Sequence, residues 1–177
     1  PPPFWAFAWA GGQALARYLL DTPEISGGKR VLDLGAGSGL TAIAPMLRGA
    51  AGVVANDVDA IALVACALNA AVNGVTIETS CDDLLQTEPE AFDVVLVGDL
   101  FYERALADKV LTYINVAASR GAVVLIGDPQ RSYFPRGRFS KVADYRVPVT
   151  RELEDAEIKQ MAHFMAEHEL RDAAAGA

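Results

Sequence analysis

Short apolar runs alternate along the first 130 residues with longer segments whose apolar positions recur every three or four residues. The short runs predict strands over residues 30–35, 52–57, 75–79, 92–99 and 121–129. Nearly continuous apolar strands separated by helices are typical of a parallel sheet that is covered on both faces. The pattern therefore predicts an α/β fold built on a Rossmann-like, doubly wound sheet.

The longer segments predict helices over residues 11–21, 40–50, 59–74 and 104–119. The second helix is predicted although it contains Pro45. The third ends at Asn73-Gly74, a common stop signal for a helix. Strands and helices thus alternate as they do in successive βαβ units.

The pattern changes after Pro129. Residues 140–149 predict a strand, whereas residues 158–167 fit both a strand and a short helix. The second possibility stays open because Ile158, Met161 and Met165 also have helical spacing. If both segments are strands, they form an antiparallel C-terminal hairpin that completes a mostly parallel sheet of seven strands.

The length of 177 residues suits one domain with one sizeable core. We expect a single domain over residues 1–170, in which the sheet core covers 29–128 and the C-terminal strands cover 129–170. Residues 1–28 form an N-terminal aromatic segment and helix, and residues 171–177 are expected to be a disordered tail.

Charge and residue content argue against several function classes. The net charge of −8 offers no basic field for nucleic acid. The apolar N-terminal run is too short to span a bilayer and has no charged n-region, so we expect an intracellular protein that does not bind membranes. The two cysteines lack metal-binding spacing and both histidines lie near the C-terminus, so we expect no metal site. A domain of this kind is expected to be a monomer.

A glycine-rich motif, "VLDLGAGSGL", joins the first predicted strand to the next helix. Gly35, Gly37 and Gly39 form G-x-G-x-G, but the dinucleotide fingerprint needs a further glycine where this chain has Leu40. Asp33 lies inside the strand, where a buried carboxylate is costly unless it meets a donor. A ligand ammonium or an N–H of the turn would be such a donor.

Further acids follow the next two strands. Asp57 ends the second strand, where a carboxylate can bind both ribose hydroxyls of an adenosine ligand. It could also cap the following helix, although Asp59 is an equally good cap. Asp82 and Asp83 follow the third strand, where one acceptor can bind the adenine amino group, and the fit of "DLL" favours Asp83.

In order and spacing, "VLDLGAGSG", "NDVD" and "CDDLL" resemble the cofactor motifs of the class I, seven-β-strand methyltransferases, over roughly residues 30 to 127. This resemblance implies that the cofactor is S-adenosylmethionine. The residues expected to bind it in this core are Asp33, Gly35, Gly37, Gly39, Asp57 and Asp83.

The run "GDLFYERALADKVL" follows the fourth strand and contains the element Asp99-x-x-Tyr102 in place of the NPPY or DPPY of base and glutamine methyltransferases. It resembles the electron transfer flavoprotein β-subunit lysine methyltransferases. "PPFWAFAWAGGQALARYLLD", "VLIGDPQRSYFP" and "YRVPVTRELED" do so as well. The resemblance implies methylation of a lysine on the electron transfer flavoprotein β subunit, in bacterial cytoplasm or in the mitochondrial matrix of a eukaryote.

The same resemblance implies roles for single residues. Asp99 would bind and orient the lysine amine, with a role as base left open, and Tyr102 would shape the lysine channel. The N-terminal segment would fold over the cofactor. Trp9 would then help to form the wall of the pocket, with Gly11 and Gly12 near the methionine part of the cofactor.

Other interpretations remain open at this stage. Phe101 is expected to pack underneath the site, and Asp128 either borders the substrate cleft or belongs to a turn. Arg131, with two neighbouring arginines, indicates a solvated loop or a docking patch for an acidic part of a protein. The alternative functions are a ribosomal-protein or small-molecule methyltransferase, a nicotinamide-dependent oxidoreductase and a non-catalytic binding module.

Overall fold

The computed structural model describes residues 3–148 and 158–166, which form a seven-stranded sheet in the order β3-β2-β1-β4-β5-β7-β6. The strands are β1 (Arg30–Leu34), β2 (Gly52–Asn56), β3 (Glu78–Ser80), β4 (Val94–Gly98), β5 (Val123–Asp128), β6 (Phe139–Pro148) and β7 (Ile158–Ala166). The first five strands pair in parallel, and β7 runs antiparallel to both β5 and β6. The predicted fold class is confirmed.

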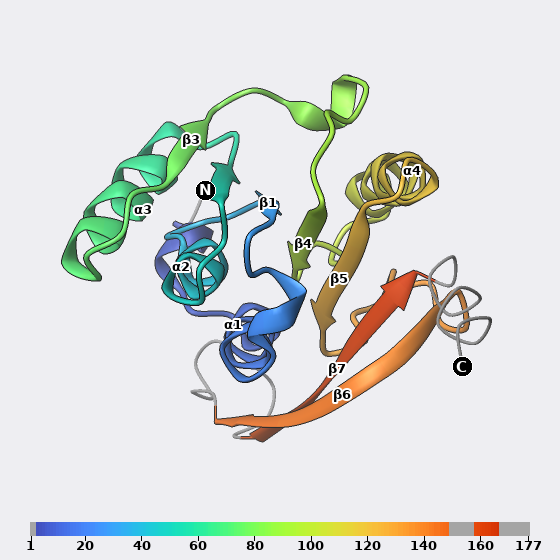
Figure 1. The fold of residues 1–177 in the computed structure, drawn as a ribbon. Coiled ribbons are helices and arrows are strands. Elements are labelled where there is room, and N and C mark those ends of the chain that lie inside the picture. The colour runs from blue at the N-terminus through green and yellow to red at the C-terminus, as the bar shows by residue number, and fades with distance from the viewer. Residues whose placement is uncertain (1–2, 149–157, 167–177) are drawn as a thin grey trace, which may run out of the picture.

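Four α-helices cover the sheet, and three short 3-10 turns accompany them. The helices are α1 (Ala10–Asp21), α2 (Leu40–Leu47), α3 (Ala60–Val72) and α4 (Arg104–Ser119), and the turns are η1 (Phe4–Ala6), η2 (Pro23–Ile25) and η3 (Leu84–Gln86). The first three helices lie on one face and α4 on the other, while β6 and β7 extend the sheet at the edge opposite β3 (Figure 1). No helix in the described ranges is long and apolar enough to cross a membrane.

The observed boundaries differ from the predicted ones where backbone hydrogen bonds decide the outcome. The strand predicted at 75–79 begins only at Glu78, because the Val75 N–H still donates to Ala70 O of the preceding helix at 3.0 Å. The helix predicted at 40–50 ends at Leu47, just before Gly49 adopts a left-handed φ of 82°. Of the ambiguous segment at 158–167, residues 158–166 form a strand, since they pair with both neighbouring strands, and residue 167 lies outside the described residues.

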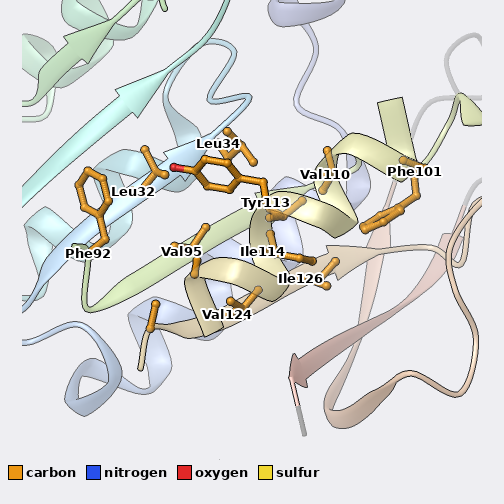
Figure 2. Close-up of a cluster of buried hydrophobic side chains, with 14 of the residues drawn as sticks. Leu32, Leu34, Phe92, Val95, Phe101, Val110, Tyr113, Ile114, Val124 and Ile126 are labelled. Carbon is orange, nitrogen blue, oxygen red and sulfur yellow. The ribbon is translucent and has the colours of Figure 1, made fainter. Parts of the chain in front are cut away.

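The four strands β1, β2, β4 and β5 supply side chains alternately to two apolar layers. Leu32 and Leu34 point to the layer under α4, which also contains Val110 and Ile114 (Figure 2). The other layer lies under α1, α2 and α3 and includes Val31, the neighbour of Leu32 in β1. Both faces of the central sheet are packed with apolar side chains. This packing holds the carboxyl ends of the parallel strands at fixed positions, all on the same end of the sheet.

Truncating the α4 layer should destabilise the fold strongly. Ile114 is 1% exposed, and Ile114→Ala is expected to lower the free energy of unfolding by about 2–5 kcal/mol through lost burial and a cavity. The matched control is Ile61→Ala, also in a helix but at a position that is 63% exposed, where a change within about 0.5 kcal/mol is expected. Urea denaturation followed by circular dichroism measures both, and equal losses would contradict the layer assignment.

Candidate active site at the strand ends

Four aspartates lie in or directly after neighbouring strands at their carboxyl ends. They are Asp33 in β1, Asp57 after β2, Asp99 after β4 and Asp128 at the end of β5, and we call this group the strand-end site. The parallel register holds them at one edge, because Leu34 of β1 lies opposite Asn56 and Gly98 of β4 opposite Gly127. In open α/β sheets, ligands bind outside these ends.

The carboxyl group of Asp33 is buried without full hydrogen bonding. The residue is 1% exposed, and its Oδ2 has no hydrogen-bond partner among the described residues. Burial raises the pKa of Asp33 to about 7, and the nearby negative charge of Asp57 adds to the shift. A buried oxygen of this kind can accept a hydrogen bond from a donor that the described residues do not provide.

The glycine turn after β1 is joined to Asp57 through its backbone. The Gly37 N–H donates to Asp57 Oδ2 at 2.9 Å, in a turn that Gly37 enters with a φ of 53°. Gly35 and Gly39 flank it in the same turn, and Gly39 packs against Cys66 of α3. The geometry therefore brings the predicted glycines and the predicted ribose carboxylate together.

The question of which acid caps α3 is answered by the hydrogen bonds. Asp59 is the N-cap, since its Oδ1 accepts from the Ile61 N–H at 2.9 Å. Asp57 accepts the Asp59 N–H at 2.9 Å through its Oδ1 and is half-buried. Asp57 therefore lies next to the glycine turn, where it binds the Gly37 N–H, and does not cap the helix.

The two acids after β3 have different surroundings. The Asp82 main-chain oxygen accepts from Asn56 Nδ2 at 2.9 Å, and its Oδ2 accepts from Ser80 Oγ at 3.0 Å. The Asp83 side chain is exposed and makes no hydrogen bond to any residue in the described ranges. Of the two acids, Asp83 therefore has the carboxylate without a hydrogen bond to the described residues, and its role at the adenine stays a prediction.

Asp99 is the most heavily engaged acid of the site. It is 6% exposed and takes a left-handed φ of 58° directly after β4. Its Oδ2 accepts the Gly12 N–H at 2.9 Å, and its Oδ1 accepts from Arg131 Nε at 3.1 Å and Nη2 at 2.7 Å. The carboxylate is thus held between the first turn of α1 and a guanidinium group.

The residues after Asp99 divide between core and surface. Phe101 is fully buried and packs edge-on against Phe134, as expected. Tyr102 is 54% exposed. Partial burial raises the pKa of its phenol, and the nearby carboxylates of Glu103 and Asp57 add to the shift, so the phenol stays protonated at neutral pH.

The start of α1 approaches the sheet so closely that only glycine fits at position 11. A Cβ there would overlap Gly127 O and Asp99 Oδ2. The Asp99 N–H itself donates to the same Gly127 oxygen at 3.0 Å. Gly11 and Gly12, predicted near the methionine part of the cofactor, are thus the residues that position Asp99.

The N-terminal aromatic segment crosses the glycine turn. The Trp9 Nε1–H donates to Phe4 O at 2.8 Å, and the Trp9 ring packs edge-on against Phe7. The backbone of Trp5 is in contact range of Gly37, since a Cβ at Gly37 would lie 3.5 Å from Trp5 Cα. The segment therefore approaches the glycine turn at Trp5 and the guanidinium of Arg131 at Trp9.

Arg131 was missed as a site residue. The sequence indicated a solvated loop or a docking patch, but the Arg131 guanidinium pairs with Asp99 and lies over the Trp9 ring at 5.5 Å from the centroid. Its main-chain N–H donates to Asp128 Oδ1 at 2.6 Å. The available signal was its position three residues beyond the end of β5, on the edge that already carried unpaired buried acids.

Asp128 is fully buried, and its Oδ2 has no hydrogen-bond partner in the described part of the chain. Burial raises the pKa of Asp128 to about 7, although the backbone N–H of Arg131 opposes the shift. Of the two interpretations given above, a turn and a cleft border, the Arg131 N–H bond shows that Asp128 shapes the turn.

A known protein family matches this chain over the region that contains the strand-end site up to β4. Residues 13–110, more than half of the chain, match the family model of the ribosomal protein L11 methyltransferase, PrmA. The chain belongs to the PrmA methyltransferase family. The resemblance to class I methyltransferases that the motifs indicated is confirmed at this level.

Individual relatives match a larger share of the chain than the family model does. The electron transfer flavoprotein beta subunit lysine methyltransferase of Danio rerio is 44% identical over 154 residues, which are 84% of this chain and 60% of that protein. The Rattus norvegicus protein of the same name is 43% identical over 152 residues, 82% of this chain and 60% of that protein. The chain thus spans about 60% of the length of these relatives.

Among solved structures, a ribosomal protein L11 methylase from Lactobacillus delbrueckii subsp. bulgaricus has the same fold. It superposes with a TM-score of 0.64 at 20% identity and covers 92% of this chain and 81% of its own. This likeness supports the sheet topology described above.

Adding a methyl group at Gly11 should disturb the strand-end site. Gly11→Ala is expected to lower the free energy of unfolding by about 1–3 kcal/mol, because backbone and Asp99 must both move. Gly12→Ala is the matched control: its Cβ would lie 3.5 Å from Thr41 Oγ1, so the variant should be as stable as the wild type or up to about 1 kcal/mol more stable. Urea denaturation compares the two, and equal effects would contradict the close approach.

The buried carboxyl of Asp33 should make stability depend on pH. In the unfolded chain it loses its proton near its ordinary pKa of 3.8, and in the folded protein only near about 7, so rising pH favours unfolding across this window. Asp33→Asn removes that cost. Its gain over the wild type should grow from near zero at about pH 4 to roughly 4 kcal/mol at most above about pH 7.

Denaturation curves for wild type and Asp33→Asn at several pH values test this expectation. Asp128 is present in both proteins, so its similar contribution cancels from the difference. A gain that stays constant from about pH 4 to 8 would show that Asp33 does not hold its proton through this window.

Proposed function

We propose that this domain is an S-adenosylmethionine-dependent protein-lysine N-methyltransferase whose substrate is the β subunit of the electron transfer flavoprotein. Relatives with that printed activity are 43–44% identical, and the PrmA family contains methyltransferases. The observation that carries the proposal is the buried Asp99 carboxylate, held after β4 on the same edge as the glycine turn and Asp57. An acceptor for an amine thus stands beside a site suited to adenosine.

The residues present fit the proposed cofactor. Asp33 has a buried oxygen that needs a donor, and Asp57 lies at the mouth of the glycine turn, where it can hold ribose hydroxyls. The exposed Asp83 carboxylate can accept from an adenine amino group. The segment from Trp5 to Trp9 would cover the bound cofactor on the side that faces away from the sheet.

S-adenosylmethionine supplies a methyl group on a positively charged sulfur. The chain must bring a neutral lysine amine to that carbon and keep water away from it. Asp99 would accept a hydrogen bond from the amine and orient it, and Tyr102 would border the channel with its ring and phenol. Phe101 fixes the position of both neighbours by packing into the core.

The amount of neutral amine limits the reaction at physiological pH. A lysine with an ordinary pKa of about 10.4 is neutral in roughly one molecule in 2,500 at pH 7, which adds about 4.6 kcal/mol to the barrier. Correct positioning of two reactants can contribute roughly 7–11 kcal/mol, so it can outweigh this cost. A site that mainly aligns the amine is therefore sufficient.

We further propose that residues 1–170 act as one monomeric domain, in bacterial cytoplasm or in the mitochondrial matrix of a eukaryote. A net charge of −8 disfavours nucleic acid as the substrate and suits a protein with a basic or neutral face. Size-exclusion chromatography with light scattering tests the oligomeric state.

The decisive experiment is intact-mass spectrometry of purified electron transfer flavoprotein after incubation with the domain and S-adenosylmethionine. The wild type should add mass in steps of one methyl group to the β subunit, at lysine. Asp99→Asn should lower the rate by about 100-fold or more, because the amine loses its charged acceptor. Asparagine tolerates the left-handed φ at this position, so the fold should survive.

Two controls make the result specific. Asp108→Asn changes an exposed carboxylate on α4 in the same way and should leave the rate unchanged. Calorimetry should show that Asp99→Asn still binds S-adenosylhomocysteine. Ribosomal protein L11 serves as the alternative acceptor, since the family model carries that name; methylation of L11 alone would overturn the substrate assignment. Binding of NADH in place of S-adenosylhomocysteine would overturn the reaction class.

A further inference from the structure

An amine-binding carboxylate works against the reaction it serves. A lone negative charge beside lysine stabilises the ammonium form, whereas only the neutral amine has the lone pair that attacks carbon. A lysine methyltransferase built on an unpaired aspartate would therefore bind its substrate in the unreactive protonation state. The strand-end site has a feature that resolves this conflict.

Arg131 places a permanent positive charge next to the Asp99 carboxylate. Its Nε and Nη2 both donate to Asp99 Oδ1, and the two side chains are only 18% and 7% exposed. A guanidinium keeps its charge at every pH at which the enzyme works. Because a positive and a negative group lie in direct contact, their charges largely cancel and the pair presents little net charge to an approaching lysine.

We propose that Arg131 is a positioning residue that neutralises Asp99, so that the carboxylate orients the incoming amine without favouring its protonated form. This inference rests on the proposed lysine methyltransferase function and explains how the same carboxylate can serve it. Arg131 acts through Asp99 and through its own charge, and takes no proton from the substrate.

The loop after β5 is shaped to hold this arginine in place. Asp128 Oδ1 accepts the main-chain N–H of Arg131 at 2.6 Å, and Gln130 between them has a left-handed φ of 59°. On its other side the guanidinium lies over the ring of Trp9. Backbone, carboxylate and aromatic ring therefore fix the cation from three directions, unlike a side chain in a solvated loop.

Other charged groups of the site do not explain the same effect. Asp57, Asp128 and Glu103 are acids near the strand ends, and a negative charge on any of them would favour the protonated lysine, as an Asp99 without Arg131 would. Tyr102 stays protonated at neutral pH, and the first turn of α1 contributes a backbone dipole through Gly12. On β7, His163 lies opposite Gly127 in the sheet register. All of these remain when Arg131 alone is changed, so they cancel from the comparison.

The test is the pH dependence of kcat, measured on the flavoprotein β subunit from about pH 6.5 to 10, because kcat reports ionisation in the enzyme–substrate complex. Replacing Arg131 by glutamine should move the alkaline midpoint upwards by roughly one unit. The variant should then be about 10-fold slower at pH 7.5 and recover most of this loss near pH 10. Arg131→Lys keeps the charge and should keep the wild-type midpoint.

Arg17→Gln is the matched control, since it removes an exposed arginine–aspartate pair from α1 and should leave the profile unchanged. S-adenosylhomocysteine should bind all variants alike. If Arg131→Gln lowers kcat by the same factor at every pH, or leaves it unchanged, Arg131 is only structural and the inference is wrong.

Failure of the proposed function would look different. An unmethylated β subunit with a methylated L11 removes the substrate assignment, and the same profile is then taken on L11. If the wild type methylates neither protein, the proposed function and this inference both fall. If Arg131→Gln loses its circular dichroism signal, Arg131→Lys decides instead. An unchanged alkaline midpoint of kcat in Arg131→Lys supports the inference, and a shifted midpoint overturns it.

Discussion

A buried negative charge at the end of β4 sets the requirements that much of this structure meets. Asp99 is nearly inaccessible to water, so its carboxylate needs donors from the protein. The donors come from two other regions, the Gly12 N–H at the start of α1 and the guanidinium of Arg131 after β5. Satisfying one carboxylate thus fixes the N-terminal segment, the tip of β4 and the loop after β5 relative to one another.

The two halves of the strand-end site treat their acids differently. Asp99 has its donors in place, whereas Asp33 keeps an unsatisfied buried oxygen and a raised pKa. A carboxyl group in that state lowers the stability of the protein alone and favours any ligand that supplies a donor. The Asp33 half of the site therefore lacks a donor among the described residues, whereas the donors of the Asp99 half are in place.

Much of this arrangement could be predicted from the sequence because parallel strands impose a shared direction. Once "VLDLG", "VVAND" and "VVLVGD" were identified as strands, their terminal acids had to meet at one edge, whatever the details of the loops. The glycine turn and its neighbour Asp57 follow from the same logic. Phe101 was placed correctly because an apolar ring directly after a buried strand has few other places to go.

The rest depended on tertiary contacts that no local pattern encodes. Gly11 and Gly12 are adjacent to Asp99 only because α1 packs closely on Gly127, a residue more than a hundred positions away. Arg131 follows a Pro-Gln pair that is typical of a solvated turn, and only the acids predicted at the neighbouring strand ends indicate its inward direction. The late start of β3 reflects a hydrogen bond back to α3, which apolar periodicity cannot show.

The separation along the chain between Gly12 and Asp99, 87 residues, has a consequence for how the protein matures. Local helices can form early, but loops this long must close before the carboxylate meets its N–H donor, and Arg131 comes later still. During synthesis the N-terminal glycines leave the ribosome long before their partners exist. The Asp99 half of the site is therefore among the last parts of the domain to assemble, and a nascent chain stalled before β5 would lack the hydrogen bonds of Arg131 to Asp99.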